Sequence, residues 1–154
     1  MDQATAVLDK LLTLAGLESR IEGTEDDEHI SLVIHGPDTG LIIGKKGQTL
    51  DAIQHLVNKI VSHGKGEGEG KPIHLDSEGY RARRAEALIE LANRLAEKAR
   101  KTGRPVAADP MSAADRRIIH VTLAEAEGVT TRSEGEGVHR HLIVVPTGAP
   151  AAAE

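Results

Sequence analysis

The sequence predicts an α+β protein built from two small α/β-sandwich domains that a long helix joins. Apolar residues repeat at three- and four-residue steps in some segments and at alternate positions in others, so both helices and strands are expected. The 154 residues are enough for one domain of average size or two small ones. An uninterrupted helical pattern at 77–101 separates a first region, residues 1–76, from a second, residues 77–148. A Pro- and Ala-rich tail at 149–154 is expected to be disordered.

The composition excludes several classes of protein. The absence of cysteine excludes disulfides, thiolate zinc sites and a cysteine nucleophile. Tyr80 is the only aromatic residue, so base stacking on aromatic platforms is not the expected recognition mode. No apolar run approaches the ~20 residues of a membrane span. Asp2 and Asp9 lie where a signal peptide would carry positive charge and an apolar stretch, so a cytoplasmic protein is expected.

The charge is unevenly distributed along the chain. The formal net charge is −5, and residues 1–40 carry nine acidic and two basic side chains. Residues 81–117 carry ten basic and five acidic side chains. A local basic patch, rather than the net charge, determines attraction to a polyanion. A long solvated helix with mixed charges is the alternative explanation.

Helical and strand patterns alternate through the first region. An apolar stripe that includes Val7, Leu11 and Leu14 predicts an amphipathic first helix. Alternating apolar residues then predict a hairpin, with the acidic residues 24–28 as its exposed connection. Asp38 is placed to cap a short helix. The expected elements are a helix at 3–17, strands at 18–22 and 29–35, helices at 39–43 and 48–62, a polar Gly-rich loop at 63–71 and a strand at 71–76.

The first region is organised around the turn Gly44-Lys45-Lys46-Gly47. Glycines tolerate positive φ and permit close backbone approach. The start of the following helix favours an anion beside the two lysines. A Walker A loop needs four residues between its glycines and a Lys followed by Ser or Thr, but Gly40 and Gly44 are separated by three. The dinucleotide fingerprint also fails, because the spacing here is Gly-x-x-x-Gly-x-x-Gly.

The pattern Ile43-Gly44-x-x-Gly47-x-x-Leu50-x-x-Ile53 resembles the core signature of a KH domain. The Gly-x-x-Gly loop of that domain clamps the backbone of about four nucleotides. With the order of elements, the resemblance implies the type II arrangement, αββααβ, for residues 1–76. It implies nucleic-acid contacts from Ile43, Gly44, Lys45, Lys46, Gly47 and Leu50. A bare Gly-x-x-Gly can also be a simple turn between two helices.

The second region opens with a long helix. Ser77 is expected to cap it, and Leu88, Leu91 and Leu95 line one side. Ser112 is expected to cap the next helix, with an acidic residue three positions later. The expected elements are a helix at 77–101, an extended piece at 104–108, a helix at 112–126 and a hairpin of strands at 129–133 and 138–145.

Arg116 and His120 are four residues apart on the second of these helices, so they share a face. The segment 115–120, followed by 131–137 and Arg140, resembles the R-three-H domain, a small fold that binds single-stranded nucleic acid. A KH domain joined to such a domain through Tyr80-Arg81-x-Arg83-Arg84 resembles the bacterial Jag family, also called SpoIIIJ-associated proteins or KhpB, over about residues 3–147. The resemblance implies further contacts from Arg81, Arg83, Arg84, Arg116, Arg117, His120 and Arg140. Without the flanking pattern, Arg116 and His120 would be ordinary residues of a solvated helix face.

The expected function is binding of single-stranded RNA in post-transcriptional regulation, with single-stranded DNA and homo- or hetero-oligomers left open. The resemblance implies a role in cell elongation and division and a second small KH protein as partner. Family members often carry an additional amino-terminal Jag domain, and a role tied to that piece is left open. The alternatives are a protein scaffold whose KH face dimerises and a phosphate-handling or metal-dependent hydrolase. No metal, cofactor or enzymatic activity is expected, because His120, His139 and His141 lack a completing ligand and no catalytic set can be assembled.

Overall fold

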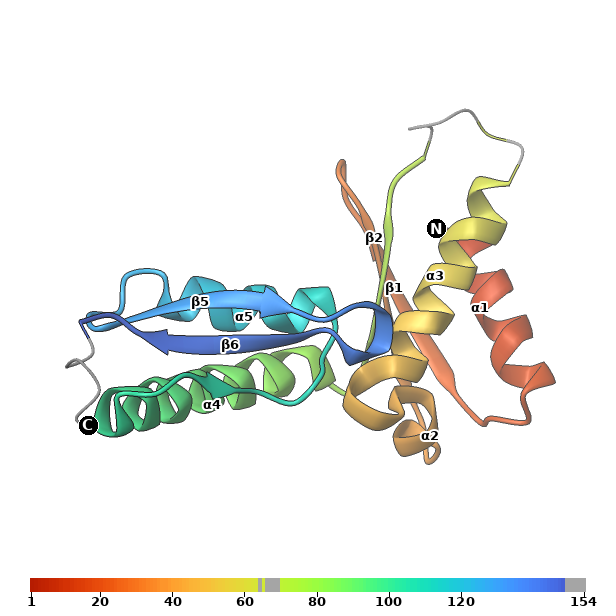
Figure 1. The fold of residues 1–154 in the computed structure, drawn as a ribbon. Coiled ribbons are helices and arrows are strands. Elements are labelled where there is room, and N and C mark those ends of the chain that lie inside the picture. Colours follow the sequence, from red (N-terminus) through yellow and green to blue (C-terminus); the bar gives the residue numbers. More distant parts are fainter. Residues whose placement is uncertain (64, 66–69, 149–154) are drawn as a thin grey trace. The chain divides into compact units, whose positions relative to one another are not determined.

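The computed structural model describes residues 1–63, 65 and 70–148 (Figure 1). Contacts between residues divide the chain into two compact units, Met1–Arg81 and Ala82–Glu154. The Gly-rich loop is therefore only partly described, and the expected disordered tail at 149–154 lies outside the described residues. The domain boundary between residues 76 and 77 stays a prediction.

The first unit is a three-stranded sheet with helices against one face (Figure 1). The strand order is β1-β2-β3, in which β1 and β2 are antiparallel and β2 and β3 are parallel. This arrangement confirms the expected class and element order. The elements are α1 (Asp2–Leu14), β1 (Arg20–Glu25), β2 (Ile30–His35), α2 (Thr39–Ile43), the 3-10 turn η1 (Lys45–Gly47), α3 (Gln48–Ser62) and β3 (Ile73–Ser77).

The core of the first unit lies between the sheet and its helices. Alternate residues of β2 and β3 are buried, as the two-residue period of a strand requires. On α1 the buried residues are Ala4, Leu8 and Leu12. The expected stripe on this helix is right only in part, since Val7 and Leu11 pack against this core but Leu14 is 72% exposed. The leucines of α1 form two overlapping stripes at helical spacing, one through Leu8 and Leu12 and one through Leu11 and Leu14. Periodicity alone does not show which stripe is buried.

The second unit is a three-stranded antiparallel sheet with the order β4-β6-β5. Its core joins the apolar faces of two helices to residues of β5 and β6. Three of the four buried residues of α4 are alanines, which permit close helix packing. The elements are α4 (Tyr80–Thr102), β4 (Val106–Ala107), α5 (Ala113–Leu123), β5 (Val129–Glu134), the 3-10 turn η2 (Gly137–His139) and β6 (His141–Pro146).

Two strands differ from their expected limits by three residues at one end. β1 continues past residue 22 to Glu25, because its pairing with β2 extends until Glu25 lies opposite Ile30. The acidic connection is correspondingly shorter. β6 begins at His141 instead of residue 138, because the preceding residues form η2. His139 therefore lies in η2 and His141 begins β6, although the expected strand at 138–145 would have placed both on one strand face.

The three expected helix caps have different outcomes. The Ser112 cap is confirmed, because its Oγ accepts a hydrogen bond from the amide of Asp115 at 3.2 Å. The Ser77 cap is wrong, since Ser77 is the buried last residue of β3 and α4 begins at Tyr80. Asp38 precedes α2 as expected, but its carboxylate accepts a hydrogen bond from a backbone amide before β1 instead of capping the helix.

The described residues contain neither a membrane-spanning helix nor a cluster of metal-binding side chains. No helix in residues 1–63, 65 and 70–148 is both long and apolar enough to cross a bilayer. In the same residues, no three His, Asp or Glu side chains are grouped so that they could hold a metal ion.

Candidate nucleic-acid interface

The glycine turn, Gly44–Gly47, connects α2 to α3 and has no room for side chains at its two ends. Gly44 and Gly47 have φ values of 69° and 79°, a region that side chains rarely adopt. A Cβ on Gly44 would collide with Oγ1 of Thr49. A Cβ on Gly47 would lie 2.7 Å from Cε1 of Tyr80. Glycine is therefore required at both positions by the backbone and by the surrounding atoms.

The two lysines of the glycine turn differ in their settings. Lys45 is exposed, whereas Lys46 is half-buried and has a φ of 53°, which is uncommon for a residue with a side chain. No side chain caps the start of α3. The first amides of α3 and the positive end of its dipole therefore add to the charge of the lysines.

The two apolar residues expected to contact a ligand at this turn are not equivalent. Ile43 is half-buried at the end of α2, where part of its side chain reaches the surface. Leu50 is 0% exposed in the core of the first unit. Leu50 therefore packs in the core beneath the turn, and its expected contact with a ligand stays a prediction.

Two of the expected arginines at the start of α4 have internal partners. Arg81 donates from Nε to the carbonyl of Leu75 at 2.8 Å, and its Nη1 lies 2.9 Å from Oδ1 of Asp51. Arg84 donates from Nε and Nη2 to Oδ2 of Asp115 at 3.1 and 2.7 Å. The Arg84 and Asp115 side chains are only 21% and 11% exposed.

Both guanidinium groups therefore bond within the protein, and the expected nucleic-acid contacts of Arg81 and Arg84 stay a prediction. Arg83 lies between them in sequence and is exposed on α4. It stays among the expected contacts.

In the second unit, a groove of about 350 Å³ lies between α5 and β5. We call it the α5–β5 groove. Arg116 is half-buried in it, and Arg117 and His120 are exposed. The structure therefore brings together the three residues that the sequence placed on one helix. The lining residues are Ala113, Arg116, Arg117, His120, Thr131, Arg132, Ser133 and Leu142.

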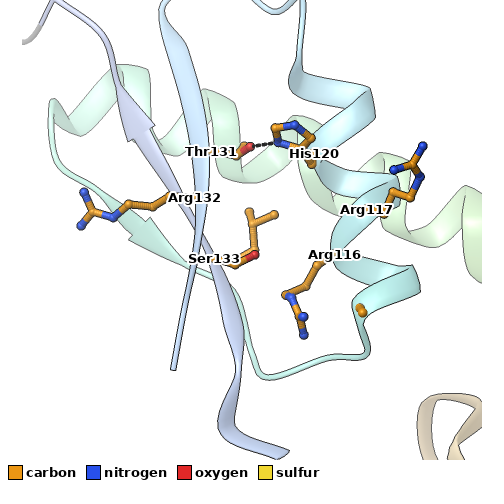
Figure 2. Close-up of a pocket in the computed structure, with 8 residues that line it drawn as sticks. Arg116, Arg117, His120, Thr131, Arg132 and Ser133 are labelled. Atoms are coloured by element: carbon orange, nitrogen blue, oxygen red, sulfur yellow. Dashed lines mark hydrogen bonds between the residues drawn. The ribbon is translucent and has the colours of Figure 1, made fainter. Parts of the chain in front are cut away.

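The β5 side of the groove follows from the strand's alternation. Val129, Thr131 and Ser133 share one face, and Val129 is in the core beneath the helices. Thr131 and Ser133 therefore continue the helix-facing side of the sheet beyond the core. Arg132 is on the other face, where its Nε is 2.7 Å from Oε1 of Glu134. Figure 2 shows Arg132 pointing away from the other labelled side chains.

Hydrogen bonds hold the helix side of the groove in place. Nδ1 of His120 is 2.6 Å from Oγ1 of Thr131 (Figure 2). Nη1 of Arg116 donates to the carbonyl of Met111 at 2.6 Å. Asp115, the neighbour of Arg116, is tied to Arg84 and so anchors the first turn of α5. The result is a fixed array of hydrogen-bond donors along one side of an open groove.

Arg140 does not line this groove. Its Nη1 donates to the carbonyl of Gly135 at 2.8 Å, within the connection from β5 to β6. Sequence reasoning assigned no contact to three residues, Tyr80 at the glycine turn and Thr131 and Ser133 on β5, although all three lie in segments that carry the family resemblance. For the two hydroxyl residues, the available signal was their alternation with the apolar Val129.

The two units together define a class of protein. The first has the order and glycine turn of a type II KH domain, and the second carries the Arg-x-x-x-His helix of an R-three-H domain. Family-model comparisons agree, because residues 2–69 match the KhpA/KhpB KH domain and residues 86–146 match the R-three-H domain.

Comparison with curated proteins identifies the family. The chain is 33% identical over 146 residues to the RNA-binding protein KhpB of Bacillus subtilis (strain 168), covering 94% of this chain and 69% of that protein. It is 41% identical over 124 residues to the RNA-binding protein KhpB of Clostridium symbiosum, covering 80% of this chain and 55% of that protein. This chain belongs to the KhpB family, also called the Jag family, as the sequence resemblance indicated. It spans about half the length of the Clostridium symbiosum relative.

Proposed function

We propose that this chain binds single-stranded RNA through two surfaces, the glycine turn and the α5–β5 groove. One observation carries the proposal: among the described residues, those lining the α5–β5 groove include arginines, a histidine and two hydroxyl residues but no carboxylate. Such donors suit the phosphate oxygens of a nucleic-acid backbone. The names of the relatives, all called RNA-binding proteins, support the choice of RNA.

The cellular role belongs to the same proposal. By resemblance to the Jag family, we propose a cytoplasmic protein that acts in post-transcriptional regulation of cell elongation and division. A second small KH protein is the proposed partner. The matched family is not an enzyme family, and no reaction is proposed.

RNA binding by the full chain tests the proposal. Changing Lys45 and Lys46 together to Asp should weaken binding of a 20-nucleotide strand about tenfold or more, which corresponds to about 1.4 kcal/mol. The matched control changes Arg94 and Lys98 to Asp, because both are exposed on α4 and the change in net charge is the same. An equal loss in both variants would show that only net charge matters.

A protein scaffold is the second candidate function. Leu56 and Ile60 are one turn apart on α3 and remain 49% and 44% exposed. If the chain is a scaffold, changing Lys45 and Lys46 to Asp should not affect its function. Equilibrium binding of RNA by the variant therefore separates the two candidates.

Use of both surfaces predicts a dependence on strand length. Two linked sites can exceed the affinity of either one by about 10² to 10⁴ when one ligand spans both. Changing Arg116 and His120 to Ala in the full chain should therefore weaken binding of a long strand strongly and of a four-nucleotide strand little. No change with either ligand would exclude the α5–β5 groove from the interface.

A further inference from the structure

We propose that the α5–β5 groove holds two successive phosphates of one strand, one between Arg116 and Ser133 and the next between His120 and Thr131. This inference rests on the proposed function and adds the number and spacing of the bound phosphates. It also assigns binding roles to two hydroxyl residues that the Arg-x-x-x-His pattern does not include.

The spacing of the four side chains supports two phosphate positions. Arg116 and His120 are four residues apart, or about 6 Å along a helix axis. Thr131 and Ser133 are two residues apart, or about 6.8 Å along a strand. One nucleotide contributes six backbone bonds, as do two residues of a β-strand. On each wall, the distance between the two side chains therefore matches the spacing of successive phosphates in one strand.

The order of the residues pairs the two walls correctly. The two elements present their residues in opposite order, so that Ser133 lies near Arg116 when Thr131 lies near His120. Figure 2 shows this arrangement, with the hydrogen bond between Nδ1 of His120 and Oγ1 of Thr131 at one end and Ser133 opposite Arg116 at the other. Each end thus combines a nitrogen donor with a hydroxyl.

The donors at each end are not exhausted by internal contacts. The guanidinium of Arg116 has five N–H donors, and Nη1 gives one to Met111. Ser133 is exposed. If the Thr131 hydroxyl donates to Nδ1 of His120, Nε2 carries a proton that can be donated to a phosphate. If Nδ1 donates to Thr131, the hydroxyl proton can be donated instead. Every protonation state therefore leaves a donor in this pair.

The acidic side chains near the groove are directed to other partners. Asp115 binds Arg84, and Glu134 binds Arg132. A phosphate at either position therefore meets donors on both walls. Because the contacts reach phosphate oxygens, we expect this groove to bind without strong base preference.

Small nucleotides test the spacing directly. We expect uridine 3′,5′-bisphosphate to bind the full chain at least about tenfold more tightly than uridine 5′-monophosphate, measured by NMR titration of the amides of α5 and β5. Uridine 5′-diphosphate is the control, because it also has two phosphates but without a nucleoside between them. Equal binding of the diphosphate and the bisphosphate would overturn the inference.

Two conservative variants test the hydroxyl residues. Ser133→Ala and Thr131→Val should each reduce the advantage of the bisphosphate several-fold. Thr130→Val is the matched control, because Thr130 is exposed on the opposite face of β5. If both variants and the control behave alike, the hydroxyl residues have no binding role.

The outcome also separates this inference from the proposed function. Strong binding of a 20-nucleotide RNA with no preference for the bisphosphate would overturn the two-phosphate arrangement and leave the proposed function intact. Failure of the full chain to bind any single-stranded RNA would overturn both.

Discussion

The ring of Tyr80 occupies the space beside Gly47, where a Cβ would lie only 2.7 Å from the ring atom Cε1. Gly47 is buried and has a φ of 79°. Tyr80, the first residue of α4, therefore packs against Gly47. Residue 47 faces two separate constraints, one from its backbone and one from its neighbour.

The two constraints can be measured separately. Gly47→Ala should destabilise the protein by more than the roughly 1–2 kcal/mol that a left-handed residue costs. In a Tyr80→Ala background the same change should cost less, because the clash with the ring is gone. Urea unfolding of the four proteins gives the coupling free energy. Gly40→Ala is the control, since nothing lies within 4 Å of its Cβ position. An equal cost in both backgrounds would contradict the prediction.

The ion pair of Arg84 with Asp115 should contribute to stability. Arg84→Met leaves a largely buried carboxylate without its partner, so we expect a loss of about 3 kcal/mol in the free energy of unfolding. Arg94→Met, at an exposed position on the same helix, is the control. Adding Asp115→Leu to the Arg84 variant should recover part of the loss, because the unpaired charge is removed. Thermal unfolding provides the measurement, and similar melting temperatures for the Arg94 and Arg84 variants would refute the structural role.

The salt dependence of RNA binding should reflect the number of cationic side chains that contact phosphates. Four contacts, from Lys45, Lys46, Arg116 and Arg117, predict a log-log slope of about −3, at roughly −0.7 per contact. Lys45→Gln should reduce the magnitude of this slope by about 0.7. Arg81→Gln should leave it unchanged, because its guanidinium bonds within the protein. Filter binding at several salt concentrations tests this, and a slope near zero excludes phosphate contacts.

Acid should weaken the contribution of Glu25 to the stability of the folded protein. Hydrogen bonds from the terminal amine of Met1 and from Lys71 lower the pKa of Glu25 from 4.5 to about 2. The folded state therefore favours the ionised form. Its contribution is complete above pH 4.5 and is lost as the pH falls from about 4.5 to about 2.

Unfolding by urea at two pH values tests this assignment. The difference in midpoint between the natural chain and Glu25→Gln should be larger at pH 6 than at pH 3. Glu90→Gln, at an exposed position on α4, is the control. A difference that is independent of pH would show that the interactions of Glu25 do not depend on its charge.

The order of the elements was predictable because it depends on local periodicity. Alternation identified β2 and β3, and the four-residue spacing of Arg116 and His120 placed both on one helix face. The start of α4 was not predictable in the same way. A serine before a helical pattern can cap the helix or end the preceding strand, and Ser77 does the latter.

The unpredicted parts of the site depend on contacts between distant residues. Arg84 pairs with Asp115, which is 31 residues away in the sequence, so local spacing could not identify this ion pair. The roles proposed for Thr131 and Ser133 depend on how β5 is placed against α5. Sequence spacing fixes which side chains share a face, but it does not identify the partner of that face.

The position of Tyr80 gives the protein an optical property. The chain has one tyrosine and no tryptophan or phenylalanine. Its ultraviolet emission therefore arises from a single ring in contact with the glycine turn. No tryptophan is present to accept the excitation energy or mask the signal. A change in the surroundings of the glycine turn should therefore change the intensity of the Tyr80 emission. This change can be measured in the natural chain without an added label.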